Sequence, residues 1–159
     1  MKVLVIYHSL TGNTEKLAKA VAEGVEKEGV ECVIKRAREV KREDFLSADA
    51  IIAGSPVYFG SMASDLKKVF EDFVDIRDEM EGKIGAAFAT SADPSGGKET
   101  TILSILQAML IYGMIVVGDP MLAGGHYGVA CTGRPTKRDL DNAIKLGERV
   151  ARLVKRLRG

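Results

Sequence analysis

Three hydroxyl side chains lie close together in the segment Ser9–Thr14, which reads SLTGNT. This segment joins an apolar run, Val3–Tyr7, to a helical pattern of apolar residues that starts at Leu17. A helix N-terminus offers free backbone N–H groups and a dipole that favours negative charge. No Lys or Arg occurs from Tyr7 to Glu15, whereas a triphosphate normally recruits a lysine and magnesium. The turn therefore predicts a phosphate monoester site, with a simple helix cap as the alternative, at Ser9, Leu10, Thr11, Gly12, Asn13 and Thr14.

A second segment, Gly54–Ala63, reads GSPVYFGSMA and combines a proline, two adjacent aromatic residues and a glycine. Proline stiffens a turn, aromatic rings supply flat apolar surface, and Gly60 lets the backbone approach a ligand closely. An isoalloxazine ring needs these features. We therefore expect one ring of the Tyr58–Phe59 pair to pack into the core and the segment to reach the edge of a flavin, through Pro56, Val57, Tyr58, Phe59 and Gly60.

A third segment, Thr90–Thr101, is rich in small and polar residues and opens another helical pattern. Its two glycines expose backbone N–H groups that can stabilise negative charge on a reduced flavin. Glycine-rich turns before helices are common, so the segment is informative only together with the other two. The three segments predict a site for flavin mononucleotide (FMN), to which this one contributes Thr90, Ser91, Ala92, Asp93, Gly96 and Gly97.

The elements that must position these segments follow from hydrophobic periodicity. Short apolar runs predict strands at 2–7, 31–35, 50–54, 84–90 and 114–117. Stripes at three- and four-residue spacing predict helices around 17–25, 62–73, 102–109 and 140–154, with a weaker one at 42–46. Strands alternating with helices indicate a single α/β domain over 1–159, with a parallel sheet covered on both faces. In such sheets a ligand binds beyond the carboxyl ends of the strands, where the three segments lie.

Four motifs together resemble the WrbA type of flavodoxin-like NAD(P)H:quinone oxidoreductases: G-S-P-x-x-F-G-S-M-A, G-G-x-E-T-T, Y-G-M-I-V-V-G and G-G-x-Y-G. The resemblance implies a three-layer flavodoxin-like sandwich with a five-stranded parallel sheet of order 2-1-3-4-5. It also implies FMN contacts in the three segments above and electron transfer from NAD(P)H to a quinone-like acceptor. A dimeric or tetrameric homo-oligomer is implied as well.

This chain departs from the WrbA pattern in two places. Members of the family usually carry a longer insertion with a tryptophan in the substrate pocket, whereas this chain has no Trp and passes quickly from Phe73 to Ile84. They often have a histidine where Tyr112 precedes Gly113-Met114. Tyr112 is therefore a candidate for catalysis and for a hydrogen bond near the flavin, or else a partly buried structural tyrosine.

The segment Gly118–Arg134 is long and glycine-rich for an ordinary connection, which favours a functional role. The resemblance makes His126 and Tyr127 candidates for contact with substrate or with another subunit. His126 is a candidate proton donor to a reduced quinone, and a solvated loop histidine is the alternative.

Composition limits the partners. The net charge is +1, and the basic residues near the C-terminus suit the end of a helix better than a nucleic-acid surface. Neither a signal peptide nor a membrane-spanning run is apparent, and Cys32 and Cys131 have no metal-ligand spacing, so we expect a cytoplasmic protein without metal, nucleic acid or membrane partners. Cys32 is expected in the core and Cys131 in a loop.

Two other functions remain open at this stage. A flavodoxin-type electron carrier would exchange electrons with protein partners. However, such carriers tend to be acidic and to sandwich the flavin with aromatic residues from both ring loops, and Thr90–Thr101 contains none. A binding module that has lost its cofactor would have little reason to keep the hydroxyl-rich turn.

Overall fold

A parallel sheet forms the centre of the molecule. The computed structural model describes all 159 residues, and the strand order is β2-β1-β3-β4-β5, with β6 also pairing with β4. Apolar residues dominate the central strands: Val5 lies opposite Ile34 on one side and Ile52 on the other. The expected order is confirmed. The strands are β1 (Lys2–Tyr7), β2 (Glu31–Arg36), β3 (Ala50–Pro56), β4 (Ile84–Ser91), β5 (Ile115–Val116) and β6 (Val129–Thr132).

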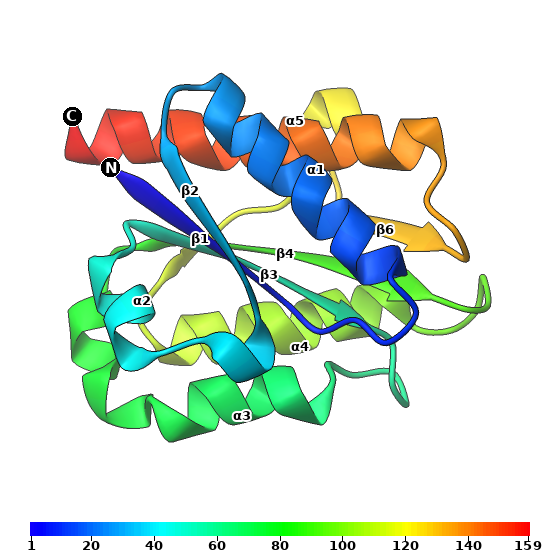
Figure 1. The fold of residues 1–159 in the computed structure, drawn as a ribbon, viewed down its shortest axis with the longest axis horizontal. Helices are drawn as coiled ribbons and strands as arrows, with labels where there is room; N and C mark the ends of the chain where they lie inside the picture. The colour runs from blue at the N-terminus through cyan, green and yellow to red at the C-terminus, as the bar shows by residue number, and fades with distance from the viewer.

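Helices cover both faces of the sheet (Figure 1). One face carries α1 (Asn13–Lys27) and α5 (Lys137–Arg158), which pack so closely that a Cβ added to Gly24 would lie 2.0 Å from the carbonyl oxygen of Ile144. The other face carries α2 (Arg42–Ser47), α3 (Ser64–Asp72) and α4 (Lys98–Ile111). Three short 3₁₀ segments complete the fold: η1 (Ala37–Glu39), η2 (Val74–Met80) and η3 (Met121–Ala123).

The fifth position of the sheet is divided between two strands. β5 pairs with β4 at Ile84 and Gly85, and β6 pairs with β4 from Phe88 to Ser91. Between β5 and β6, residues 117–128 leave the edge of the sheet and then return to it. We call this segment the edge insertion. The expectation of one continuous loop over Gly118–Arg134 is therefore wrong, because Val129–Thr132 is a strand.

Both cysteines are free. Cys131, expected in a loop, lies in β6 with 4% of its surface exposed, and burial raises the pKa of its thiol to about 11. Cys32 packs at the margin of the core as expected, and burial raises its pKa to about 12. Both thiols are therefore protonated near neutral pH.

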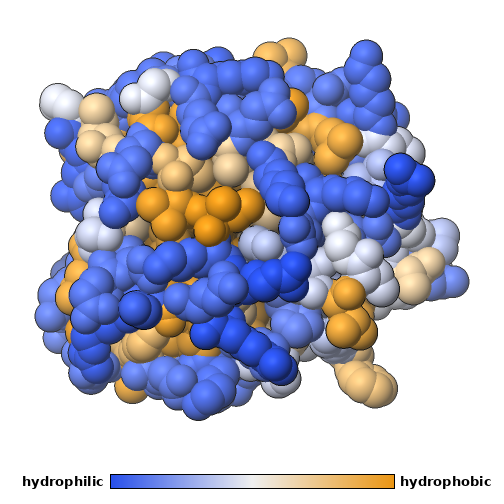
Figure 2. Space-filling model, viewed as in Figure 1, coloured by the Kyte–Doolittle hydropathy of each residue, from blue (hydrophilic) through white to orange (hydrophobic).

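The surface is mostly polar, with apolar side chains projecting over the loops that follow β1 and β3, at the lower right of Figure 2. Leu10 is 81% exposed and Phe59 is fully exposed. None of the helices combines the length and the apolar character needed to cross a bilayer.

Candidate functional site

The turn between β1 and α1 presents unpaired backbone N–H groups beside open space. The hydroxyl of Ser9 accepts a hydrogen bond from the backbone N–H of Gly12 at 3.1 Å, and Gly12 adopts a left-handed conformation with φ 90°. The first hydrogen bond along α1 runs from the N–H of Lys16 to the carbonyl of Gly12, so the N–H groups of residues 13–15 have no acceptor within the helix. Nothing lies within 4 Å of a Cβ added at Gly12, so there is space above the turn. These features suit a phosphate.

A buried pair of hydroxyls connects the start of α1 to the end of β4. The Oγ1 atoms of Thr14 and Thr90 lie 2.8 Å apart, and both side chains are buried. The strand ladder continues beyond β3, where the N–H of Val57 donates to the carbonyl of Thr90 at 2.8 Å. The structure therefore brings together the three loops singled out in the sequence.

The loop after β3 forms a tight turn that carries both aromatic rings outward. Tyr58 and Ser61 exchange two backbone hydrogen bonds of 3.1 Å, and the two residues between them, Phe59 and Gly60, have φ values of 52° and 73°. Left-handed backbone is unfavourable for a bulky residue and is found at sites where a turn has a defined role. Tyr58 is 38% exposed and Phe59 is fully exposed, so the expectation that one ring packs into the core is wrong: the turn directs both rings away from the sheet.

Two serines that the sequence analysis did not identify hold this loop in place. The fully buried hydroxyl of Ser55 donates to the carbonyl of Pro56 at 2.7 Å and accepts from the N–H of Ala63 at 2.8 Å. The hydroxyl of Ser104, on α4, accepts from the N–H of Met62 at 3.1 Å. The signal that could have identified Ser55 is its position as a polar residue inside an apolar strand.

The loop after β4 approaches the loop after β3 at two glycines. Gly97 caps α4 with φ 95°, and a Cβ added there would lie 3.2 Å from the Cα of Gly60 and 2.9 Å from the Oγ1 of Thr100. Within the loop, the hydroxyl of Ser91 donates to the carbonyl of Asp93, and Ala92 and Asp93 are exposed. The loops after β3 and β4 thus meet backbone to backbone.

Charged residues and His8 border the turn after β1. The Nδ1 of His8 lies 3.1 Å from the carboxylate of Asp65, which also accepts from the Nε of Arg38 at 2.7 Å. The ring of His8 meets that of Tyr58 edge-on, with centroids 5.9 Å apart. Arg36, at the end of β2, donates to the carbonyl of Ser9 at 3.2 Å. The sequence analysis missed Arg36 because it reaches the turn through the pairing of β2 with β1, and it missed Arg38 and Asp65 because they come from η1 and α3. His8 directly precedes Ser9, and its position beside the turn was the signal that could have identified it.

Tyr112 lies outside this site, so its assignment to flavin contact and catalysis is wrong. It follows the C-terminal end of α4, whereas the flavin loops adjoin the N-terminal end. It is 3% exposed, its hydroxyl donates to the carbonyl of Phe70 at 2.5 Å, and its ring packs against Phe45 and Phe70. Burial raises the pKa of Tyr112 to about 12. Tyr112 is a structural residue, one of the alternatives left open by the sequence.

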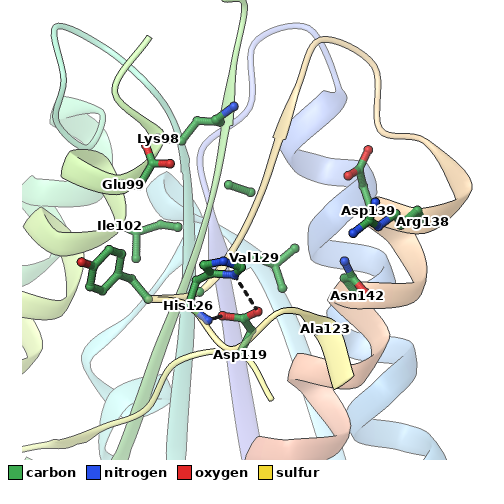
Figure 3. Close-up of a pocket in the computed structure, with 13 residues that line it drawn as sticks. Lys98, Glu99, Ile102, Asp119, Ala123, His126, Val129, Arg138, Asp139 and Asn142 are labelled. Atoms are coloured by element: carbon green, nitrogen blue, oxygen red, sulfur yellow. Dashed lines mark hydrogen bonds and ion pairs between the residues drawn. The ribbon is translucent and has the colours of Figure 1, made fainter. Parts of the chain in front are cut away.

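His126 lies in a separate pocket of about 350 Å³, formed by the edge insertion and the first turns of α4 and α5 (Figure 3). The buried carboxylate of Asp119 accepts hydrogen bonds from the N–H groups of Gly125 and His126, at 3.2 and 2.6 Å. The imidazole is 71% exposed, with its Nδ1 3.7 Å from Asp119. Lys98 and Glu99, which directly follow the loop after β4, also line this pocket, so the pocket lies beside that loop.

Comparison with known proteins agrees with this geometry. The family model described as NADPH-dependent FMN reductase matches residues 37–128. The protein named NAD(P)H dehydrogenase (quinone) from Archaeoglobus fulgidus is 39% identical to this chain, and the alignment covers 98% of each. This chain belongs to the NADPH-dependent FMN reductase family. A protein of Aquifex aeolicus named flavodoxin is also 39% identical, over 96% of this chain and 86% of that protein.

A solved WrbA-like flavodoxin from Agrobacterium tumefaciens superimposes with a TM-score of 0.83 at 25% identity, covering 98% of both chains. The expected WrbA-type resemblance is thereby confirmed. The alignment with the Archaeoglobus protein runs over 192 positions, more than the 159 residues of this chain, so that relative carries residues inserted with respect to this chain.

The residues present fit FMN. The free N–H groups and hydroxyls of the turn after β1 match a phosphate, with open space above Gly12. The outward-facing rings of Tyr58 and Phe59 and the half-buried backbone at Gly60 and Gly97 match the edge of a flat ring system.

Proposed function

We propose that the whole chain, residues 1–159, forms one FMN-binding domain that transfers electrons from NAD(P)H to a quinone-like acceptor. Bound FMN would supply the redox chemistry by accepting a hydride from the nicotinamide and reducing the acceptor. The names and full-length similarity of the relatives support this class of reaction. The arrangement of the three loops supports the place where it occurs.

The chain itself would contribute binding and placement. Ser9–Thr14 would hold the phosphate by neutral hydroxyls and by the N–H groups at the start of α1. Residues 56–60 on one side, and the end of β4 with the loop after it on the other, would border the ring; the second group comprises Thr90–Asp93, Gly96 and Gly97. Backbone N–H groups of the second loop would favour negative charge on the reduced ring.

The observation that carries the enzymatic proposal is the uneven distribution of aromatic side chains. The loop after β3 presents Tyr58 and Phe59, whereas Thr90–Thr101 contains no aromatic residue. One face of the ring would therefore have no aromatic cover. Hydride transfer needs a donor carbon roughly 3–3.5 Å from the flavin, which an uncovered face permits.

His126 is the proposed proton donor to the reduced acceptor. Its exposed imidazole, anchored through Asp119, stands in a pocket that adjoins the end of the loop after β4. Exchange of His126 for Gln should then lower the rate of quinone reduction without changing the rate of flavin reduction by NAD(P)H.

The decisive experiment is an anaerobic stopped-flow measurement on the FMN-loaded protein. NADH or NADPH should bleach the flavin absorbance near 450 nm, and a soluble quinone should restore it. Negligible bleaching over minutes would contradict the enzymatic proposal.

The alternative is an electron carrier, and one observation favours it: the Aquifex aeolicus relative of 39% identity is named flavodoxin. A carrier would be reduced slowly by NAD(P)H and rapidly by a reductase protein. The rates of flavin reduction by NAD(P)H and by a reductase protein, both measured by stopped flow, distinguish the two functions.

We also propose that the protein forms a closed homo-oligomer, a dimer or a tetramer, in the cytoplasm. A groove of about 420 Å³ between α3 and α4 is lined by Met62, Phe70 and Val74, and Ile111 beside them is 66% exposed. This apolar surface supports self-association. The two free cysteines support a reducing compartment.

A further inference from the structure

Arg36 stands at the end of β2, outside every motif of the flavin loops, yet it touches the phosphate turn. One guanidinium nitrogen, Nη1, donates to the backbone carbonyl of Ser9 at 3.2 Å. The other, Nη2, donates to the carboxylate of Glu15 at 2.5 Å. Its Cζ atom lies 5.4 Å from the centre of the Tyr7 ring, over one face. The turn and the first turn of α1 are thus joined through one side chain.

Glu15 presents an electrostatic difficulty for a phosphate site. It is the third residue of α1, and its backbone N–H is one of the three that have no acceptor within the helix. A carboxylate in this turn favours the helix dipole but repels an incoming phosphate dianion. The charges that face Glu15 are Lys19, at 2.8 Å on the solvent side, and Arg36. Arg36 is the one of these that also contacts the turn.

We infer that Arg36 is a positioning residue for the phosphate of the bound flavin. Arg36 fixes the carbonyl of Ser9 and neutralises the negative charge of Glu15. The inference rests on the proposed binding of FMN. The turn after β1 has no basic residue of its own, so the neighbouring strand β2 would supply the positive charge through Arg36. Because the guanidinium uses two nitrogens for two separate partners, a lysine can replace its charge but not both contacts.

The test compares dissociation constants of FMN and riboflavin, measured by quenching of flavin fluorescence on titration with apoprotein. Arg36→Ala should weaken FMN roughly tenfold and leave riboflavin within about twofold, because riboflavin has no phosphate. Arg36→Lys should fall between wild type and Arg36→Ala. The matched control is Arg42→Ala, since Arg42 is similarly exposed, donates to the carboxylate of Asp75 in η2 and has no hydrogen bond to the turn.

A second substitution tests the role of Glu15. Adding Glu15→Gln to Arg36→Ala should restore FMN affinity to within about threefold of wild type, and Glu15→Gln alone should not weaken it. Equal losses for FMN and riboflavin, or no recovery in the double variant, would overturn the inference. Failure of the wild-type protein to bind FMN would instead refute the proposed function itself, so the two failures are distinguishable.

Discussion

Thr14 and Thr90 show how single hydroxyl groups join segments far apart in the chain. Their Oγ1 atoms lie 2.8 Å apart between the turn after β1 and the end of β4. Replacing Thr14 by Val would leave the buried hydroxyl of Thr90 without this partner. We expect a loss of about 1–3 kcal/mol in the free energy of unfolding, measured by urea denaturation. The double variant with Thr90→Val should lose less than the sum of the single variants, and strict additivity would contradict this coupling.

A substitution at Tyr112, which follows the C-terminal end of α4, tests whether this residue is structural. Its hydroxyl donates to the carbonyl of Phe70, in the last turn of α3, where carbonyls lack donors within the helix. Tyr112→Phe should therefore lower the free energy of unfolding by about 1 kcal/mol and leave FMN affinity unchanged. Weaker FMN binding at unchanged stability would return Tyr112 to the flavin site.

These two residues also show what sequence reasoning can determine. Thr14 lies at the start of α1, just after the turn that follows β1, and the end of a strand in a parallel sheet has a known place, so its neighbourhood was predictable. Tyr112 was placed by resemblance to a motif, and the motif does not state which way the ring points. Its burial depends on Phe45 and Phe70, residues far from it in sequence.

At the scale of the elements, the start of α4 is the most sensitive point of the site. Gly97→Val would force a branched residue into φ 95° and bring its Cβ to 3.2 Å from Gly60. The two ring loops must then separate, and we expect FMN affinity to fall by more than about tenfold, along with roughly 1–2 kcal/mol of backbone strain. Fluorescence titration measures the first effect and thermal unfolding the second.

Gly29→Val is the control for this prediction. Gly29 has a comparable φ of 72°, but nothing lies within 4 Å of an added Cβ. Stability should fall while FMN affinity stays at the wild-type value. A similar loss of FMN affinity in both variants would mean that strain alone, and not the contact between the loops, is responsible.

The contacts of Asp44, in the short helix α2, should make the free energy of unfolding depend on pH. The carboxylate of Asp44 accepts from the Nζ of Lys35 and from the N–H of Lys41, each at 2.7 Å. Partial burial raises the pKa of Asp44, but the hydrogen bonds from Lys35 and Lys41 outweigh it, so the pKa is lowered overall. A lowered pKa stabilises the fold above the unfolded value of about 3.9, and this contribution disappears as the pH falls through the folded value.

Asp44→Asn should accordingly cost about 1–2 kcal/mol in the free energy of unfolding at pH 7 and almost nothing near pH 2. Urea denaturation at the two pH values measures both. A cost that is the same at both pH values would contradict the ionic origin of the effect.

The strands and helices of the interior followed from periodicity, because each carries an uninterrupted apolar pattern. β6 did not, because its four residues stand among glycines and turn residues and its strand character comes from pairing with Phe88–Ser91. The loops after β3 and β4 lie at the carboxyl ends of the strands, as the sequence predicted. The outward direction of Tyr58 and Phe59 was not predictable, since it depends on the left-handed backbone of Phe59.

At the scale of the whole molecule, the apolar surface between α3 and α4 predicts self-association. Ile111→Glu would place a charge in this surface and should reduce the mass measured by light scattering to that of a monomer. Leu157→Glu is the control, because Leu157 is similarly exposed, at 55%, but lies near the C-terminal end of α5. A monomeric mass for the FMN-bound wild type at micromolar concentration would contradict the prediction.

The divided fifth position limits how molecules can join strand to strand. An exposed edge strand offers a row of unpaired N–H and C=O groups on which a strand of another chain can grow. Here that row is interrupted, because β5 has two residues, β6 has four, and the edge insertion lies between them. At the opposite edge, β2 carries the charges of Glu31, Lys35 and Arg36. The border at β5 and β6 therefore presents no long template, and at the β2 border the short apolar run Cys32–Ile34 lies between charged residues. Both features favour resistance to intermolecular sheet growth and to aggregation during folding.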